Sequence, residues 1–188
     1  NVYINVNQWA VVACDQFTSE PGYWKALETH VGESPSTLKM ILPEVYLEDG
    51  DTQERISITQ NVMKTYINEG VFSPFEGFIL VERTLADPEQ KGKTVSRYGL
   101  MIALDLEQYD YAKGSQSLIR ATEGTIIDRL PPRMKIRRDA PVELPHILVL
   151  IDDPGCTVIE PLVNQSDEFD VAYDTELFGN GGHLKGYK

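Results

Sequence analysis

The longest apolar runs of this chain each have the length of one short strand. They lie at residues 9–14, 99–104 and 147–151, and all are far too short to cross a bilayer as a helix. No signal-peptide pattern is present, and neither of the two cysteines belongs to a C-x-x-C pair, which fits a reducing cytoplasm. The sequence therefore predicts a soluble, cytoplasmic protein without membrane contact, built from short strands and packed helices.

Two apolar runs predict strands that are buried on both faces. Residues 9–14 and 144–151 are nearly unbroken in their apolar character, as is typical of covered strands. The first run ends at Asp15, and open α/β sheets bind ligands beyond the carboxyl ends of their strands. Asp15 is therefore a candidate site residue. Residues 38–46 are also strand-like, and Pro43 within them is typical of an edge strand.

Polar turns divide other strand-like segments into hairpins. Residues 78–81 and 95–104 flank the turn-rich stretch 87–93, while residues 171–178 and 183–187 flank a Gly-Asn-Gly-Gly turn. Both patterns predict antiparallel pairs of strands.

Apolar residues at helical spacing predict two helices. One follows Pro21 and ends near Gly32, and the other begins near Asp51 and ends at Gly70. We therefore expect a mixed α/β (α+β) fold: a mixed sheet with antiparallel hairpins and two or three packed helices. Residues 1–188 fit one domain. The start at Asn1, without a methionine, leads us to expect the N-terminal part of a longer protein.

The charge of residues 113–138 runs against that of the rest of the chain. This segment holds seven of the 17 Lys and Arg residues but only two of the 29 acidic ones, in a chain of net charge −12. Such a cluster either binds an anion through guanidinium groups or is an exposed basic surface. The strongly negative remainder argues against a nucleic-acid partner. A small anionic metabolite or a nucleotide is the partner that we expect.

Within this segment, small polar residues and guanidinium groups alternate. The loop Gly114-Ser115-Gln116-Ser117 can present backbone N–H groups to an oxyanion, and a helix opening at Thr125 and closed by Pro131 would place Arg129 in its first turn. The alternation from Arg133 to Arg137 predicts an extended basic arm. Glu123 is the candidate catalytic carboxylate. The predicted phosphate-binding residues are Ser115, Ser117, Arg120, Thr125, Arg129 and Arg133.

Several site classes are disfavoured by missing motifs. There is no G-x-x-x-x-G-K-[ST] loop, no G-x-G-x-x-G after a strand and no G-x-S-x-G elbow. His30, His146 and His183 do not have the spacing of metal ligands, so no metal site is predicted. Asp152 and Asp153 offer oxygen ligands for a divalent cation, but a solvated turn that caps a helix is the favoured interpretation.

Long runs of the sequence resemble a bacterial family of unknown function, DUF1015, in its clostridial-type branch. They are W-A-V-V-A-C-D-Q-F-T-S-E-P-G-Y-W at 9–24, I-L-P-E-V-Y at 41–46, K-G-S-Q-S-L-I-R-A-T-E-G-T-I-I-D-R-L-P-P-R at 113–133 and L-P-H-I-L-V-L-I-D-D-P at 144–154. The family is distantly similar to the ParB and sulfiredoxin-like superfamily, which includes free-serine kinases. Its members are often encoded beside enzymes of serine biosynthesis.

This resemblance implies phosphate chemistry with a carboxylate as base, and it points to Glu123. Thr122 stands where other branches carry a histidine. An Asp-Gly-Asn-His-Ser or Asp-Gly-His-His-Arg motif, expected downstream, is absent, and Gly182-His183 does not match it.

Three functional hypotheses remain open. The first is a kinase-like phosphotransferase that uses ATP or ADP with Mg²⁺ on an amino-acid-sized, serine-like substrate, with Asp15 placing Mg²⁺ or the substrate amine. The second is a non-catalytic module that senses a metabolite. The third is a protein-interaction domain, for which a homodimer is an expected form.

Overall fold

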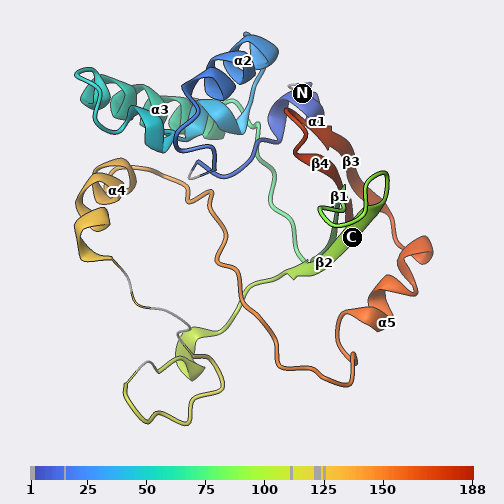
Figure 1. The fold of residues 1–188 in the computed structure, drawn as a ribbon. Coiled ribbons are helices and arrows are strands. Elements are labelled where there is room, and N and C mark those ends of the chain that lie inside the picture. Colours follow the sequence, from blue (N-terminus) through green and yellow to red (C-terminus); the bar gives the residue numbers. More distant parts are fainter. Residues whose placement is uncertain (1–2, 15, 111, 121–123, 125) are drawn as a thin grey trace.

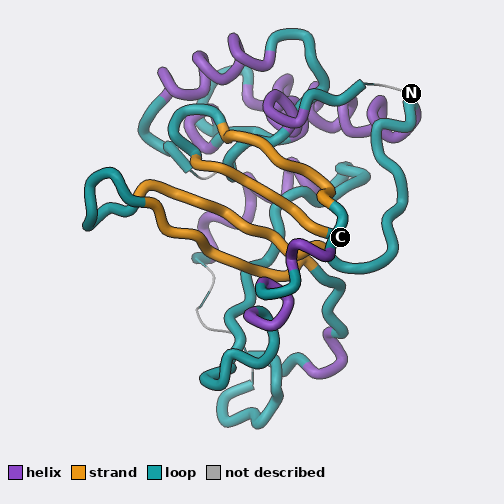
Figure 2. Tube along the Cα trace, turned by 90° about the vertical axis from the view of Figure 1, so that its right-hand side faces the viewer, coloured by secondary structure: helices purple, strands orange, loops and turns teal. Residues whose placement is uncertain are grey.

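The computed structural model describes residues 3–14, 16–110, 112–120, 124 and 126–188, and the side chain of Arg129 is outside this description. The helices of residues 6–68 gather at one end of the molecule, a twisted sheet lies beside them, and long connections complete the far end (Figures 1 and 2). The described residues form five α-helices and a four-stranded antiparallel sheet. This arrangement confirms the predicted α/β class with its antiparallel hairpins.

The helical layer contains α1 (Val6–Trp9), α2 (Pro21–Val31) and α3 (Thr52–Asn68). Pro21 starts α2, where its missing N–H costs nothing, and Trp24, Leu27 and Val31 are buried on one face as their spacing predicted. The short 3₁₀ helices η1 (Thr37–Met40) and η2 (Glu44–Tyr46) bring further apolar residues into the same core. Among the described helices, none has the length and apolar character needed to span a membrane.

The sheet contains β1 (Ile79–Ala86), β2 (Thr94–Met101), β3 (Val171–Leu177) and β4 (Gly182–Tyr187), in the order β2-β1-β4-β3. Both predicted hairpins are present, β1 with β2 and β3 with β4. They are joined because β4 also pairs with β1, from Leu80 opposite Tyr187 to Thr84 opposite His183. Segments a hundred residues apart in the sequence therefore form the middle of one sheet.

Residues 9–14 do not form the predicted buried strand. Asn5 caps α1 by accepting a hydrogen bond from the backbone of Asn7, and the chain then continues outside the sheet, with Val12 packed into the core of the helical layer. The apolar run is thus used to cover helices and not to pair with strands. Asp15 itself lies outside the described residues. Residues 38–46 likewise form η1 and η2 in place of an edge strand.

The segment 144–151 is the second predicted strand that the structure contradicts. It belongs to no sheet, and the side chains from Ile147 to Ile151 are between 51% and 88% exposed. It connects α4 (Leu130–Arg137) to α5 (Glu160–Val163), which lie on opposite sides of the molecule in Figure 1. The segment pairs with no strand of the sheet along this course.

The predicted helix boundary at Pro131 is also wrong. Pro131 and Pro132 lie in the first turn of α4, where proline is tolerated because those N–H groups have no helical partner. Arg133, Lys135 and Arg137 are therefore helical and do not form the extended arm that their alternation suggested. The backbone up to Arg129 forms a separate 3₁₀ turn, η4 (Ile127–Arg129).

The close approach of β4 to β1 depends on Gly182. Its φ is +83°, and a Cβ there would lie 2.3 Å from the backbone oxygen of Thr84. Gly92, in the turn between β1 and β2, has a similar φ of +84° but open space around the Cβ position. Substitutions at the two glycines therefore distinguish the cost of backbone strain, which both share, from the cost of steric overlap, which only Gly182 adds.

We expect Gly182→Ala to lower the free energy of unfolding by more than Gly92→Ala does. The Gly92 variant bears only the conformational cost of about 1–2 kcal/mol, whereas the Gly182 variant must also separate two paired strands. Urea denaturation followed by circular dichroism measures both values. Equal losses in the two variants would show that the strand contact at Gly182 is unimportant.

Candidate functional site

The loop that contains the predicted oxyanion-binding residues 114–117 is closed by contacts between its own residues. Tyr109 and Ile119 form an isolated bridge across its ends, and the Ser115 hydroxyl accepts a hydrogen bond of 3.0 Å from the backbone N–H of Ser117. The Ser117 hydroxyl contacts the carbonyl oxygens of Gln108 and Ile119, so its single proton is committed inside the loop. Of the two predicted serines, Ser115 keeps its hydroxyl proton free of any described contact.

Arg120 is oriented by the same loop. Its Nε donates a hydrogen bond of 2.8 Å to the carbonyl oxygen of Ser117, and the residue is exposed. No described carboxylate forms an ion pair with it. Its two terminal nitrogens therefore remain available for a planar anion.

The other predicted site residues are not brought to this loop by the described structure. Arg133 lies on α4 and is exposed, and α4 is distant from the loop in Figure 1. Glu123, Thr125 and Asp15 lie outside the described residues, as does the side chain of Arg129. Arg137, from the same basic segment, is paired with Glu143 at 3.0 Å.

A second group of polar residues, unforeseen as a site, crosses one face of the sheet. Residues that alternate along each strand point to the same face, and the strand register places them in two rows, which we call the polar face. One row has Glu176, His183, Thr84 and Ser96, and the other has Asp174, Lys185, Glu82 and Tyr98. The next row contains Leu80 and Tyr187, which are buried and bound the polar face on one side.

Glu82 is the centre of one hydrogen-bond network on the polar face. Its Oε1 accepts from the hydroxyls of Ser96 at 3.0 Å and Tyr98 at 2.9 Å, and its Oε2 accepts from Tyr187 at 3.2 Å. Partial burial opposes ionisation, but these three donors and the charge of Lys185 outweigh it, so the pKa of Glu82 is lowered. The carboxylate thus ties β1 to both neighbouring strands.

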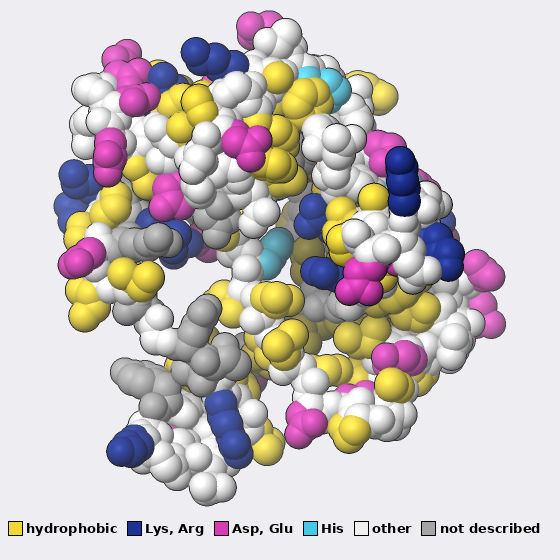
Figure 3. Space-filling view, viewed as in Figure 1, with side chains coloured by type: hydrophobic (Ala, Val, Ile, Leu, Met, Phe, Trp, Pro, Cys, Tyr) yellow, Lys and Arg dark blue, Asp and Glu magenta, His cyan; other side chains and the backbone are white. Residues whose placement is uncertain are grey.

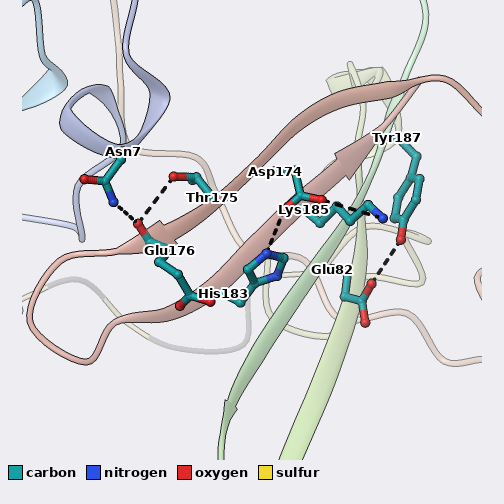
Figure 4. Close-up of polar contacts among 8 residues, drawn as sticks. All are labelled: Asn7, Glu82, Asp174, Thr175, Glu176, His183, Lys185 and Tyr187. Atoms are coloured by element: carbon teal, nitrogen blue, oxygen red, sulfur yellow. Dashed lines mark hydrogen bonds and ion pairs between the residues drawn. The ribbon is translucent and has the colours of Figure 1, made fainter.

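Asp174 and His183 form a further polar contact on this face. Nε2 of His183 lies 2.7 Å from Oδ1 of Asp174, and Nζ of Lys185 lies 3.7 Å from Oδ2 (Figure 4). The side chains of His183, Asp174 and Lys185 are 34%, 49% and 28% exposed. A solute can therefore reach them, while two strands fix their positions.

The sequence contains a pattern that indicates this pair, although a search for metal-ligand spacing does not detect it. Acidic residues alternate along β3 at Asp174 and Glu176, and His183 and Lys185 alternate in the same way along β4. Two alternating strands in one hairpin place these side chains on one face, and only the register decides which of them meet.

Hollows open between packed elements on the described surface. One of about 220 Å³ lies between Tyr98 and α5, and one of about 410 Å³ lies between α2 and α3 beside Tyr46 and Arg55. Neither is lined by a predicted phosphate-binding residue. Hydrophobic side chains gather around a central opening on the face that Figure 3 shows. Within the described parts of the chain, no three His, Cys, Asp or Glu residues are grouped as a metal site.

The Glu82 network predicts a pH-dependent contribution to stability. Because the folded-state pKa lies below the ordinary value of 4.5, the ionised carboxylate stabilises the fold above about pH 4.5, and this contribution is lost as the pH falls through the folded-state pKa. We expect Glu82→Gln to cost about 1 kcal/mol at pH 7 and less at pH 3. Urea unfolding at both pH values measures it.

Glu176→Gln is the matched control, since no described hydrogen bond or ion pair involves that carboxylate. It removes the same charge from the same face. A loss of stability in the Glu82 variant that is the same at pH 3 and pH 7 would contradict the role given to the ionised carboxylate.

Comparison with known proteins gives one family. Residues 2–185 match the family described as "Protein of unknown function (DUF1015)". No curated protein matches the chain, and no solved structure does. The match covers almost the whole sequence, and the chain therefore belongs to the DUF1015 family of proteins of unknown function.

Proposed function

We propose that this protein is a phosphate- or nucleotide-binding small-molecule enzyme, most concretely a kinase-like phosphotransferase on an amino-acid-sized, serine-like substrate. The observation that carries the proposal is the state of Arg120. Its guanidinium group is held by the Ser117 carbonyl oxygen at 2.8 Å, is exposed, and has no described acidic partner, although the chain carries a net charge of −12.

An oriented guanidinium group suits an anion with two coplanar oxygens. The hydrogen bond through Nε removes part of the rotational freedom that binding would otherwise cost, and the terminal nitrogens can form two parallel bonds to a phosphate. The free proton of Ser115 belongs to the same loop and would add a neutral donor. Ser117 has no free proton, so in this proposal it positions Arg120 and does not touch the ligand.

Phosphoryl transfer needs cationic groups around the transferred phosphate and a base for the attacking hydroxyl. In the proposal, Arg129, Arg133 and Thr125 extend the phosphate site, Glu123 accepts the hydroxyl proton, and Asp15 places Mg²⁺ or the substrate amine. ATP or ADP with Mg²⁺ is the proposed nucleotide. The serine-like substrate and the link to the ParB and sulfiredoxin-like superfamily are supported by the sequence resemblance, and the proposed cytoplasmic location is supported by the two cysteines, neither of which belongs to a C-x-x-C pair.

Thermal unfolding with ATP, ADP, pyrophosphate, L-serine and phosphoserine tests the proposal. A ligand at 100 times its Kd stabilises the folded state by about 2.7 kcal/mol, so at least one phosphate compound should raise Tm. Arg120→Ala should reduce this shift. Arg97→Ala, which removes an arginine from β2 outside the basic segment, should preserve it. Absence of any shift with all five compounds would overturn the proposal.

A non-catalytic module for metabolite sensing or protein interaction, associated with amino-acid (serine) metabolism, is the second candidate. The exposed apolar residues from Ile147 to Ile151 favour it, because apolar surface of this kind marks interaction sites, and a homodimer is its simplest form. Glu123→Gln separates the two functions. In an enzyme it abolishes turnover and preserves nucleotide binding, whereas in a sensing module the wild type has no turnover to lose.

A further inference from the structure

The hollow of about 410 Å³ between α2 and α3 takes no part in the proposed function. Both helices line it with residues three and four positions apart, which share one helix face, and the chain between the helices completes the wall. The residues that line it are Glu28, Val31 and Gly32 on α2, Arg55, Ile58, Thr59 and Val62 on α3, and Glu33, Leu38, Lys39, Ile41, Leu42, Pro43 and Tyr46 between them. A volume of this size with a mostly apolar wall is typical of small-molecule sites.

Thr59 brings a hydroxyl group without a partner to this hollow. The residue is only 5% exposed, and no hydrogen bond among the described residues involves its hydroxyl group. No fully buried oxygen or nitrogen of a described side chain lacks a partner, so this hydroxyl keeps a narrow opening, which the hollow provides. Removing a hydroxyl group from bulk water without a new hydrogen bond is unfavourable. A ligand in the hollow would supply the missing bond.

A guanidinium group and a carboxylate flank the buried Tyr46 at the same hollow. The guanidinium group of Arg55 lies 4.4 Å from the centre of the Tyr46 ring, and its Nε donates a hydrogen bond of 3.0 Å to Asp51. No described hydrogen bond involves its two terminal nitrogens. Burial and then the charge of Glu28 raise the pKa of Tyr46, whereas the charge of Arg55 lowers it. Both charges therefore lie close to one phenol group.

The charges of the lining residues cancel. The carboxylates of Glu28 and Glu33 balance the cationic groups of Lys39 and Arg55, although the whole chain has a net charge of −12. A multiply charged anion would not be neutralised here, and a purely apolar compound would leave the Thr59 hydroxyl unpaired. A small zwitterion brings one charge of each sign, so it is complementary to both kinds of group.

We propose that this hollow binds a free α-amino acid with an apolar side chain. The terminal nitrogens of Arg55 bind the carboxylate through two parallel hydrogen bonds, and the hydroxyl of Thr59, one helical turn further on, donates to the same carboxylate. Glu28 accepts from the ammonium group, and the apolar wall covers the side chain. The site is independent of the proposed phosphate site, because residues 112–120 lie at the other end of the molecule from α2 and α3 (Figure 1).

Isothermal titration calorimetry of the whole chain tests this ligand class with compounds that differ by one group. L-Leucine carries all three recognised groups. 4-Methylpentanoate lacks the ammonium group, 3-methylbutylamine lacks the carboxylate, and glycine lacks the apolar side chain. Each of these should bind at least about 10-fold more weakly than L-leucine. Absence of L-leucine binding, or equal affinity for any of the three, would overturn the inference.

Glu28→Gln tests the ammonium contact. It should lower the affinity for L-leucine by about 10-fold and leave the affinity for 4-methylpentanoate unchanged, since that compound has no ammonium group. Glu54→Gln is the matched control, because it removes a carboxylate from the first turn of α3 outside the hollow, and it should preserve both affinities. Unchanged affinity for L-leucine in Glu28→Gln would contradict the assigned contact and with it the inference.

Thr59→Val tests the hydroxyl group. It should lower the affinity for L-leucine by about 3- to 10-fold. Without ligand its Tm should stay the same or rise, because the variant removes a buried hydroxyl that has no partner in the protein. A lower Tm would show that this hydroxyl is paired within the fold, and that result, or an unchanged affinity for L-leucine, would overturn the inference.

Discussion

The pairing of β4 with both β1 and β3 is the constraint on which the rest of this structure depends. It joins two hairpins that are otherwise separated by the whole basic segment and by α5. The approach is close enough that only a glycine fits at position 182. The contacts of Glu82 with Tyr187 and of Asp174 with His183 are consequences of this register.

The parts of the fold with a clear period were predictable from sequence. The stripes of α2 and α3 and both hairpins are present, because helical spacing and strand–turn–strand patterns are local properties. The runs at 9–14 and 144–151 were misassigned for one reason. An unbroken apolar run indicates a preference for burial, but it does not say whether a partner strand lies within reach. The first run packs on helices, and the second pairs with no strand.

The candidate site, too, was only partly predictable from the sequence. Charge composition points to the basic segment and to Arg120 as candidates. The commitment of the Ser117 hydroxyl to backbone carbonyl oxygens depends on the closed loop, which no spacing rule reveals. The pair of Asp174 and His183 could not be found by searching for ligand spacing, because nine residues and a turn separate the two. It becomes visible only when the register of β3 and β4 is known, since a shift of one residue would turn both side chains to the other face.

The order of the strands also has a consequence for biosynthesis. When the ribosome has produced β1 and β2, the inner edge of β1 has no partner until β4, which begins at Gly182, has been made. An unpaired edge in a nascent hairpin is a template for wrong associations. The connection that follows β2 carries charged residues along its length, and the pairing of β4 with β1 then closes the exposed edge.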